Sequence, residues 1–219
     1  MRFASGNRYL TAVSICTESQ TKTCFMRFDN IDADPAVPDV AISLFMDGDR
    51  TLEGEEACIV KLPDGRLFAV MRSRFGTPLW TQSRDGGETW SDSKVVVDVS
   101  GRPILHPRAP CPAYDLGGDA AASGRYMALF TDAFDPSVGQ FEGRGPLFRY
   151  DGEFAPGDPQ PVRWRKRALL LPRDASTHYG NSCYSSFTVT DGTGVLWYPD
   201  NKRRLYGVRI PDSCAIGLD

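Results

Sequence analysis

Eight residues near the middle of the chain, Ser83–Trp90, read SRDGGETW and constrain the fold more than any other stretch. Asp85 can accept hydrogen bonds from turn amides, and the two glycines that follow it allow left-handed backbone. Thr89 can close the turn, and Trp90 supplies a large apolar ring that can pack beneath it. We therefore predict a turn with a structural role, and a metal or sugar site at Asp85 is the weaker interpretation.

Short apolar runs separated by turns surround this motif, and helical periodicity is almost absent. The chain has 21 Gly and 16 Pro, spread between aromatic and β-branched segments, which is typical of an all-β protein. Pro63-Asp64-Gly65 is one predicted turn, because Pro presets φ and Gly supplies a positive φ. The predicted strands are Asn7–Cys16, Thr23–Phe28, Val40–Phe45, Cys58–Leu62, Leu67–Met71, Pro78–Ser83, Lys94–Val99, Arg125–Thr131, Gly145–Tyr150, Cys183–Val189, Val195–Tyr198 and Arg204–Ile210.

These strands fall into about four units with a spacing of roughly 40–50 residues, which suggests the blades of a β-propeller. The segment Tyr150–Trp164 looks like a degenerate copy of the central motif with an inserted loop. Trp80, Trp164 and Trp197 are expected in the core. A chain of 219 residues can bury a sizeable core, so residues 1–219 are expected to be a single domain or part of one.

Charge and composition argue against several classes of protein. The net charge is -3, from 25 basic and 28 acidic residues. The chain therefore lacks the excess of basic residues expected of a protein that binds nucleic acid or an anionic membrane. No apolar run approaches the length of a membrane span. The first residues lack the apolar region and cleavage site of a signal peptide, so a cytoplasmic location follows if this N-terminus is authentic.

The potential metal ligands are few and scattered. Six cysteines without CxxC spacing and only two histidines predict no zinc site, and we expect no metal or other cofactor. Cys58 and Cys183 lie in apolar segments and are interpreted as buried small hydrophobes. Reduced thiols are the preferred expectation, and the even number of cysteines leaves disulfides as an alternative.

Several motifs together resemble the sialidase superfamily of propellers with Asp-box (BNR) repeats. The similar segments are Glu56–Leu67 with its Asp64-Gly65-Arg66 turn, Met71-Arg72-Ser73, the box Ser83–Trp90, Tyr184–Phe187, Leu196-Trp197-Tyr198 and Leu205–Arg209. The resemblance implies a six-bladed propeller, of which this chain shows about four blades. Two N-terminal blades are expected to be missing.

The same resemblance implies a set of site residues. Such sialidases use a Tyr nucleophile paired with a Glu, an Asp general acid/base, and three Arg that bind the sialic acid carboxylate. By position, Tyr184 resembles the nucleophile, Glu56 its partner and Arg72 the second arginine. Arg144 fits the third arginine better than its rival Arg149. Nothing upstream of Glu56 resembles the first arginine or the catalytic Asp.

The residue types suit this chemistry, although each has a plainer interpretation. A phenol with a pKa near ~10 needs an adjacent base to act as a nucleophile at neutral pH, and arginines answer a substrate carboxylate through planar contacts. Tyr184 could equally pack as a strand-start aromatic, and Glu56 could be a solvated loop acid. Arg72 could form a structural ion pair with an acid such as Glu56, and Arg144 could be a surface residue.

Other polar residues are weaker candidates. His106 is expected to be a turn histidine that could hydrogen-bond a substrate, and His178 and Tyr179 lie in a loop ahead of the Tyr184 segment. Asp132 and Asp135 follow a strand and could place a carboxylate on the site face. Their commoner role is turn formation.

Two hypotheses about function remain open. The first is a sialidase-like exo-glycosidase that hydrolyses the terminal bond of an acidic sugar with retention, through a covalent Tyr184 intermediate. The second is a catalytically incomplete propeller fragment that binds carbohydrate or a protein. Convergence of Glu56, Arg72, Arg144 and Tyr184 would favour the first. Exposed blade edges also predict pairing with another copy of the chain.

Overall fold

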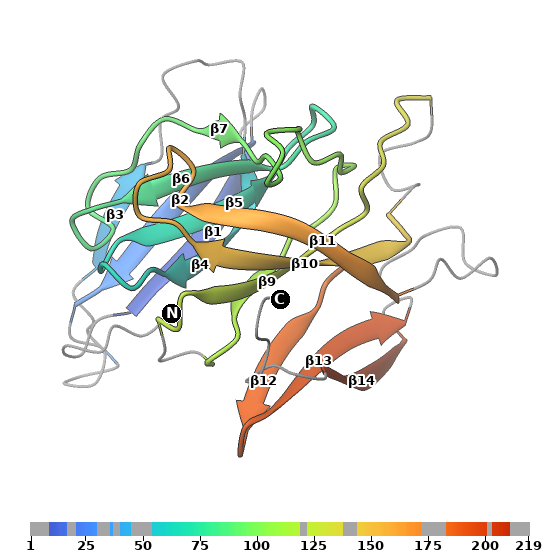
Figure 1. Ribbon diagram of the computed structural model, residues 1–219. Coiled ribbons are helices and arrows are strands. Elements are labelled where there is room, and N and C mark those ends of the chain that lie inside the picture. Colours follow the sequence, from blue (N-terminus) through green and yellow to red (C-terminus); the bar gives the residue numbers. More distant parts are fainter. Residues whose placement is uncertain are drawn as a thin grey trace.

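The computed structural model describes residues 9–16, 21–29, 36, 40–44, 54–118, 122–137, 144–171, 183–200 and 203–210. Within these residues the regular elements are fourteen strands, and they form four antiparallel sheets. Figure 1 shows the sheets following one another in chain order, from blue β1–β3 to red β12–β14. The predictions of an all-β fold and of about four units are confirmed.

We call the sheets blades 1 to 4. Blade 1 contains β1 (Tyr9–Cys16), β2 (Thr21–Phe28) and β3 (Val40–Leu44). Blade 2 contains β4 (Glu55–Lys61), β5 (Leu67–Arg72), β6 (Leu79–Ser83) and β7 (Lys94–Val95). Blade 3 contains β8 (Ala113–Asp115), β9 (Arg125–Phe130), β10 (Leu147–Phe154) and β11 (Val162–Leu171). Blade 4 contains β12 (Ser186–Thr190), β13 (Thr193–Asp200) and β14 (Arg204–Ile210).

Each blade is a meander in which strands that are consecutive in sequence are also neighbours in the sheet. The first strands of successive blades meet, because β1 contacts β4 and β4 contacts β8. This is the arrangement of propeller blades around a common axis. Loops that begin or end at these inner strands therefore lie close to one another, and several of them contribute to the candidate site.

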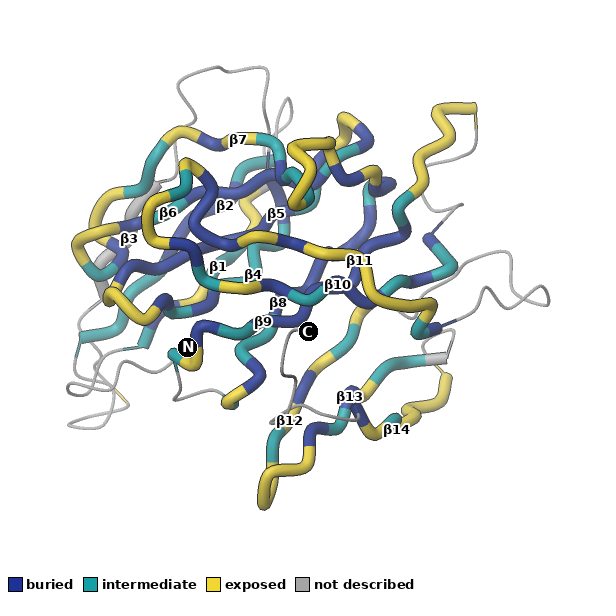
Figure 2. The backbone as a smooth tube through the Cα atoms, viewed as in Figure 1, coloured by how far each residue is buried: buried dark blue, intermediate teal, exposed yellow. Residues whose placement is uncertain are grey.

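The central strands are apolar on both faces because both faces are covered. In β5, Phe68 and Val70 belong to the core between blades 2 and 3, whereas Leu67, Ala69 and Met71 belong to the core between blades 1 and 2. All five residues are completely buried. Successive side chains of a strand point to opposite faces, so one continuous apolar run serves two interfaces. Figure 2 shows the buried backbone concentrated in these inner and central strands.

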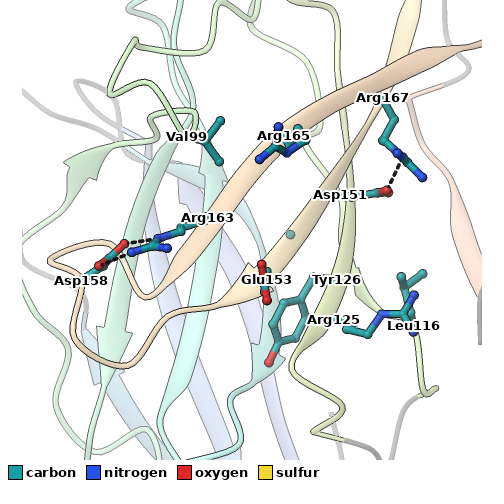
Figure 3. A pocket seen from close by; sticks show the side chains of 11 residues that line it. Val99, Leu116, Arg125, Tyr126, Asp151, Glu153, Asp158, Arg163, Arg165 and Arg167 are labelled. Carbon is teal, nitrogen blue, oxygen red and sulfur yellow. Dashed lines mark hydrogen bonds and ion pairs between the residues drawn. The ribbon is translucent and has the colours of Figure 1, made fainter. Parts of the chain in front are cut away.

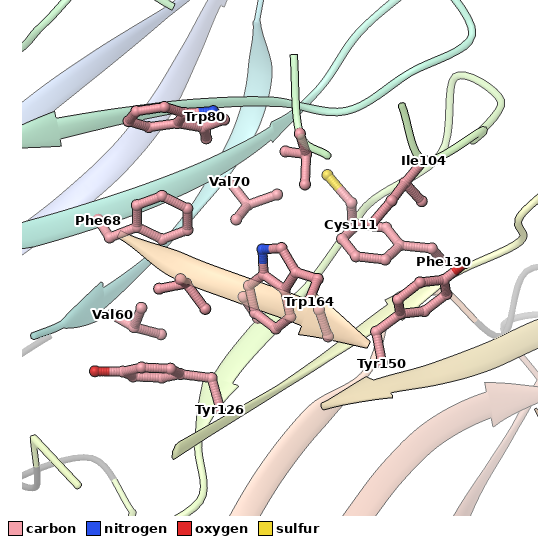
Figure 4. Packing of buried hydrophobic residues seen from close by; sticks show 14 of the residues in the cluster. Val60, Phe68, Val70, Trp80, Ile104, Cys111, Tyr126, Phe130, Tyr150 and Trp164 are labelled. Atoms are coloured by element: carbon pink, nitrogen blue, oxygen red, sulfur yellow. The ribbon is translucent and has the colours of Figure 1, made fainter. Parts of the chain in front are cut away.

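The core between blades 2 and 3 is rich in aromatic rings (Figure 4). The Phe130 ring meets the Tyr150 ring edge-on with centroids 5.2 Å apart, and the Trp164 ring edge-on at 6.2 Å. Trp164 comes from β11 and packs over Gly152 of β10, where an added Cβ would lie 2.5 Å from the indole. The absence of a side chain at Gly152 therefore makes room for Trp164.

The Ser83–Trp90 turn has the predicted structure. Asp85 accepts hydrogen bonds from the Ser83 hydroxyl and from the amide and hydroxyl of Thr89. Its partial burial opposes ionisation, but these hydrogen bonds outweigh that effect and hold its pKa at about 2. Gly86 and Gly87 have φ values of 75° and 93°. The Trp90 ring stacks on Phe25 of blade 1, with centroids 3.7 Å apart, so the turn also joins two blades.

Two predictions about blades 3 and 4 are wrong. Tyr150-Asp151-Gly152 is not part of a second box, because these residues lie inside β10 and the connection to β11 comes only after Phe154. Trp197 is not a core residue, since it is 37% exposed. Its indole donates to the Thr188 hydroxyl and lies against Gly207 on the open face of blade 4.

Four cysteines of the described residues are thiols. Cys24, Cys58, Cys111 and Cys183 are free, and Cys183 is buried as predicted. Cys58 is only partly buried, and its thiol donates to the carbonyl of Ala113 at 2.9 Å. Burial raises the pKa of the Cys183 thiol to about 11. Burial also raises the pKa of Cys58, so both thiols are protonated at neutral pH.

Candidate active site

Two adjacent glutamates at the start of β4 face one arginine at the end of β5. Glu55 is the cross-strand partner of Arg72, and the register then shifts before Cys58. Glu56 lies in this irregularity with a φ of 49°, and its amide donates to the Ser14 hydroxyl at 2.8 Å. In a regular strand, neighbouring side chains would point to opposite faces. The bulge instead brings both carboxylates to the Arg72 guanidinium.

Glu55 is the buried centre of the cluster, with 1% of its side chain exposed. Its Oε2 accepts from Arg72, at 2.8 Å from Nε and 2.7 Å from Nη2. Its Oε1 accepts from Arg108 Nη2 at 2.6 Å. A buried carboxylate must be paired and hydrogen-bonded to remain charged. Glu55 meets that condition by binding two guanidinium groups from different blades.

Glu56 forms the outer ion pair of the cluster. Its Oε2 lies 3.0 Å from Arg72 Nη1, and a third of its side chain is exposed. Burial opposes the charge of Arg72, but Glu56, Glu55 and the Tyr184 phenol together raise the pKa of its guanidinium. Glu56 and Arg72 are therefore in direct contact, and Tyr184 lies within electrostatic reach of Arg72.

Tyr184 and Arg144 approach the cluster from the loops that precede β12 and β10. Tyr184 is 41% exposed and follows the buried Cys183. The charges of Arg144, Glu56 and Arg72 are close enough to affect the pKa of the Cys183 thiol. Arg144 is buried and donates from Nη2 to the backbone carbonyl of Arg108 at 2.9 Å. Glu56, Arg72, Arg144 and Tyr184 thus gather in one region of the fold.

The loop that carries Arg108 is held by a buried histidine. His106 is 1% exposed, and its Nδ1 accepts from the amide of Thr131 at 3.1 Å. Its Nε2 therefore carries the proton and donates to the carbonyls of Ala109 and Pro110. Burial lowers the pKa of His106 to about 4. His106 is consequently a neutral part of the loop structure, in agreement with the expectation of a turn histidine.

The weaker candidates lie elsewhere or are engaged otherwise. Asp132 binds Lys166 Nζ at 2.8 Å, and Asp135 accepts from Ser137 within its own turn. Arg149, the rival of Arg144, pairs with Asp151 at 2.6 Å. His178 and Tyr179 lie outside the described residues.

A separate hollow lies over β10 and β11 on the side of blade 3 that faces blade 4 (Figure 3). Arg163 pairs there with Asp158, and Arg167 with Asp151. The hollow contains none of the four predicted site residues. Two of its four arginines are ion-paired with aspartates in this way.

No group of three or more His, Cys, Asp or Glu side chains in the described ranges is placed to hold a metal ion. Within those ranges, no helix has the length and apolarity needed to cross a membrane.

Sequence reasoning missed Glu55 and Arg108. Glu55 stood beside Glu56 in an acidic run, and strand alternation gives no reason for both carboxylates to reach the same arginine. Arg108 stood in the loop ILHPRAPCP, where three prolines and a histidine mark an ordered turn but no particular function. The one sequence signal that could have identified Arg108 is the presence of an arginine inside a proline-rich, apolar loop.

Neither a protein-family profile nor a curated protein sequence matches the chain. Solved structures do. A mutant of NanB sialidase from Streptococcus pneumoniae superposes with a TM-score of 0.61 at 18% identity, covering 90% of this chain and 26% of that one. The leech intramolecular trans-sialidase superposes with a TM-score of 0.51 at 18% identity, and the match covers 87% of this chain and 26% of the trans-sialidase. An alpha-L-arabinofuranosidase catalytic domain from Coprinopsis cinerea superposes with a TM-score of 0.54 at 10% identity, and the match covers 92% of this chain and 59% of that domain.

The chain therefore has the propeller fold of sialidases and related glycosidases. It spans about a quarter of the length of the two sialidases.

Proposed function

We propose that this chain carries the nucleophile and anion-binding side of a sialidase-like exo-glycosidase site. Tyr184 would attack the anomeric carbon of an acidic sugar, and Glu56 would take the phenolic proton. Arg72 and Arg144 would bind the carboxylate of the sugar. The observation that carries this proposal is the contact between Glu56 and Arg72 at 3.0 Å, with Tyr184 acting on the charge of the same arginine.

The chemistry follows from the charges involved. A carboxylate nucleophile would be repelled by a substrate carboxylate, whereas a neutral phenol is not, and a neighbouring base can activate it. The arginines answer the substrate charge with planar, two-pronged contacts. Attack by Tyr184 would form a glycosyl–tyrosine bond as the bond to the aglycone breaks, and the departing aglycone oxygen would take a proton from solvent. Water would then displace the Tyr184 oxygen, which would regain the proton held by Glu56, and the sugar would be released with its original anomeric configuration. Sialidases with a Tyr nucleophile depart in this way from the usual pair of carboxylates.

Hydrolysis of 4-methylumbelliferyl N-acetylneuraminic acid tests the proposal. We expect Tyr184→Phe to lower kcat/KM by about 10²–10⁴-fold, the usual range for loss of such a catalytic group. Tyr206→Phe is the matched control, since Tyr206 is 40% exposed on β14 and lies outside the cluster. It should leave the rate unchanged. Equal rates for the wild type and Tyr184→Phe would reject Tyr184 as the nucleophile.

A second candidate function is binding of an acidic carbohydrate without turnover. In the described part of the cluster, the carboxylates are Glu55 and Glu56, and both are ion-paired with arginine. Neither is placed as a protonated acid for the leaving group. Saturable binding of N-acetylneuraminic acid, together with no release of 4-methylumbelliferone by the wild type, would favour this function over hydrolysis.

A further inference from the structure

We propose that Arg108 is a further substrate-binding residue, whose guanidinium contacts the carboxylate of an acidic sugar beside Arg72. This inference rests on the proposed function, since it assigns a ligand contact within the same site. Arg108 comes from the loop that enters β8 of blade 3, whereas Arg72 ends β5 of blade 2. The two arginines converge although 36 residues separate them in sequence.

A single buried carboxylate sets the position of both guanidinium groups. Arg72 Nη2 lies 2.7 Å from Glu55 Oε2, and Arg108 Nη2 lies 2.6 Å from Glu55 Oε1. The two oxygens of one carboxylate are close together, so the two cationic groups lie side by side. Two adjacent guanidiniums offer an array of N–H donors that matches the oxygens of a second carboxylate.

The charges of the cluster favour an anion. Arg72 contacts Glu55 and Glu56, Arg108 contacts Glu55, and Arg144 donates to the backbone carbonyl of Arg108, so these five side chains carry a net charge of +1. Arg108 is the most accessible of the three cations, with 28% of its side chain exposed against 13% for Arg72, and Arg144 is only 4% exposed. A ligand that enters from solvent would therefore meet Arg108 before the other two.

A purely structural role would be the neutralisation of Glu55. Arg108 shares that role with Arg72: Arg72 Nε donates to Oε2 at 2.8 Å, and Arg108 donates to Oε1 at 2.6 Å and to Oε2 at 3.4 Å. The backbone around Arg108 is also fixed, because Arg144 donates to its carbonyl and His106 donates to the carbonyl of Ala109. A cation on a rigid loop loses little conformational entropy when it binds a ligand, which is what a binding residue requires.

The test compares a charged ligand with its uncharged form. The probes are the methyl α-glycoside of N-acetylneuraminic acid and the methyl ester of that glycoside, titrated by calorimetry. We expect the wild type to prefer the acid. Arg108→Gln should reduce the acid-to-ester affinity ratio by about 10- to 100-fold, as for loss of a hydrogen bond between charged groups. Any unfolded fraction of the variant cancels, because both ligands are titrated into one preparation.

Two controls separate contact from indirect effects. Arg163→Gln removes the same charge from an exposed ion pair on β11, and it should leave the ratio unchanged. Arg108→Gln made in an Arg72→Gln background should still lower the affinity for the acid if Arg108 contacts the ligand itself. If Arg108 acted only by holding Arg72, its effect would vanish in that background.

An unchanged ratio in Arg108→Gln, an effect that vanishes in the Arg72→Gln background, or a wild type that does not prefer the acid would each overturn the inference. Turnover of the fluorogenic sialoside judges the proposed function separately. Arg108-dependent binding without turnover would support this inference and reject hydrolysis. Turnover with no Arg108 dependence of the ratio would support hydrolysis and reject this inference.

Discussion

His106 should make the folded protein less stable below neutral pH by a predictable amount. Its imidazole is 1% exposed, and burial lowers its pKa from 6.5 to about 4. Protonation of Nδ1 would set a second donor against the amide of Thr131, which now donates to that atom. The positive charge of Arg144 opposes protonation as well. Folding therefore favours the neutral imidazole.

The direction of the effect follows from linkage. The unfolded chain takes up the proton near pH 6.5 and the folded protein only near pH 4. The stabilisation is thus fully present above about pH 6.5, and it is lost as the pH falls toward 4. Each pH unit between these values changes the free energy of unfolding by about 1.4 kcal/mol. Between pH 7.5 and pH 4.5 the loss through His106 amounts to about 2.5 kcal/mol.

Urea denaturation followed by tryptophan fluorescence at the two pH values measures this loss. The chain has two histidines, so the experiment uses a His178→Gln background in which His106 is the sole imidazole. His106→Gln in that background should show a change in unfolding free energy between the two pH values that is smaller by about 2.5 kcal/mol. The carboxylates titrate in both proteins, and any uniform destabilisation cancels in the difference. An identical pH dependence in both would refute the assignment of His106 as a buried neutral group.

Two further predictions concern the fold. Asp85→Ala removes the acceptor that binds Ser83 and Thr89, and it should lower the free energy of unfolding in urea by about 1–2 kcal/mol; a value near zero would contradict the structural role of the turn. Gly152→Ala places a Cβ 2.5 Å from the Trp164 ring and should cost about 1–3 kcal/mol, whereas Gly157→Ala meets no atom within 4 Å and should be nearly neutral. Equal melting temperatures for the two alanine variants would contradict the packing described around Trp164.

Much of the fold is predictable because it depends on local chemistry. The run Leu67–Met71 is apolar throughout, and a short run of this kind between a Pro-Asp-Gly turn and an arginine predicts a strand buried on both faces. The hydrogen bonds that the Ser83 and Asp85 side chains form in this turn lie within eight residues, so that sequence alone contains the groups that shape the turn. Grouping of strands into four blades follows from the regular spacing of such turns.

The outer part of blade 3 is less predictable because it is not apolar. β11 begins VRWRKR, and the side chains of Arg163, Arg165 and Arg167 are exposed on one face. A strand that pairs on one edge and presents arginines to solvent has no hydrophobic alternation beyond Val162 and Trp164. Its existence is decided by pairing with β10, which is a tertiary contact. For the same reason the Tyr150–Gly152 segment resembled a turn when it is strand.

The position of Glu55 in the candidate site is also not predictable from the sequence alone. Regular alternation would point Glu55 and Glu56 to opposite faces, and Glu56 alone would then be assigned to the site. The bulge before Cys58 and the φ of 49° at Glu56 remove that alternation, at a cost of about 1–2 kcal/mol for a left-handed non-glycine residue. In return both carboxylates bind Arg72, and the buried one also binds Arg108. The buried carboxylate is neutralised in part by Arg108, which comes from a loop of another blade. The cluster therefore depends on a residue that is distant in sequence as well as on the local irregularity, so the β4 segment by itself does not predict it.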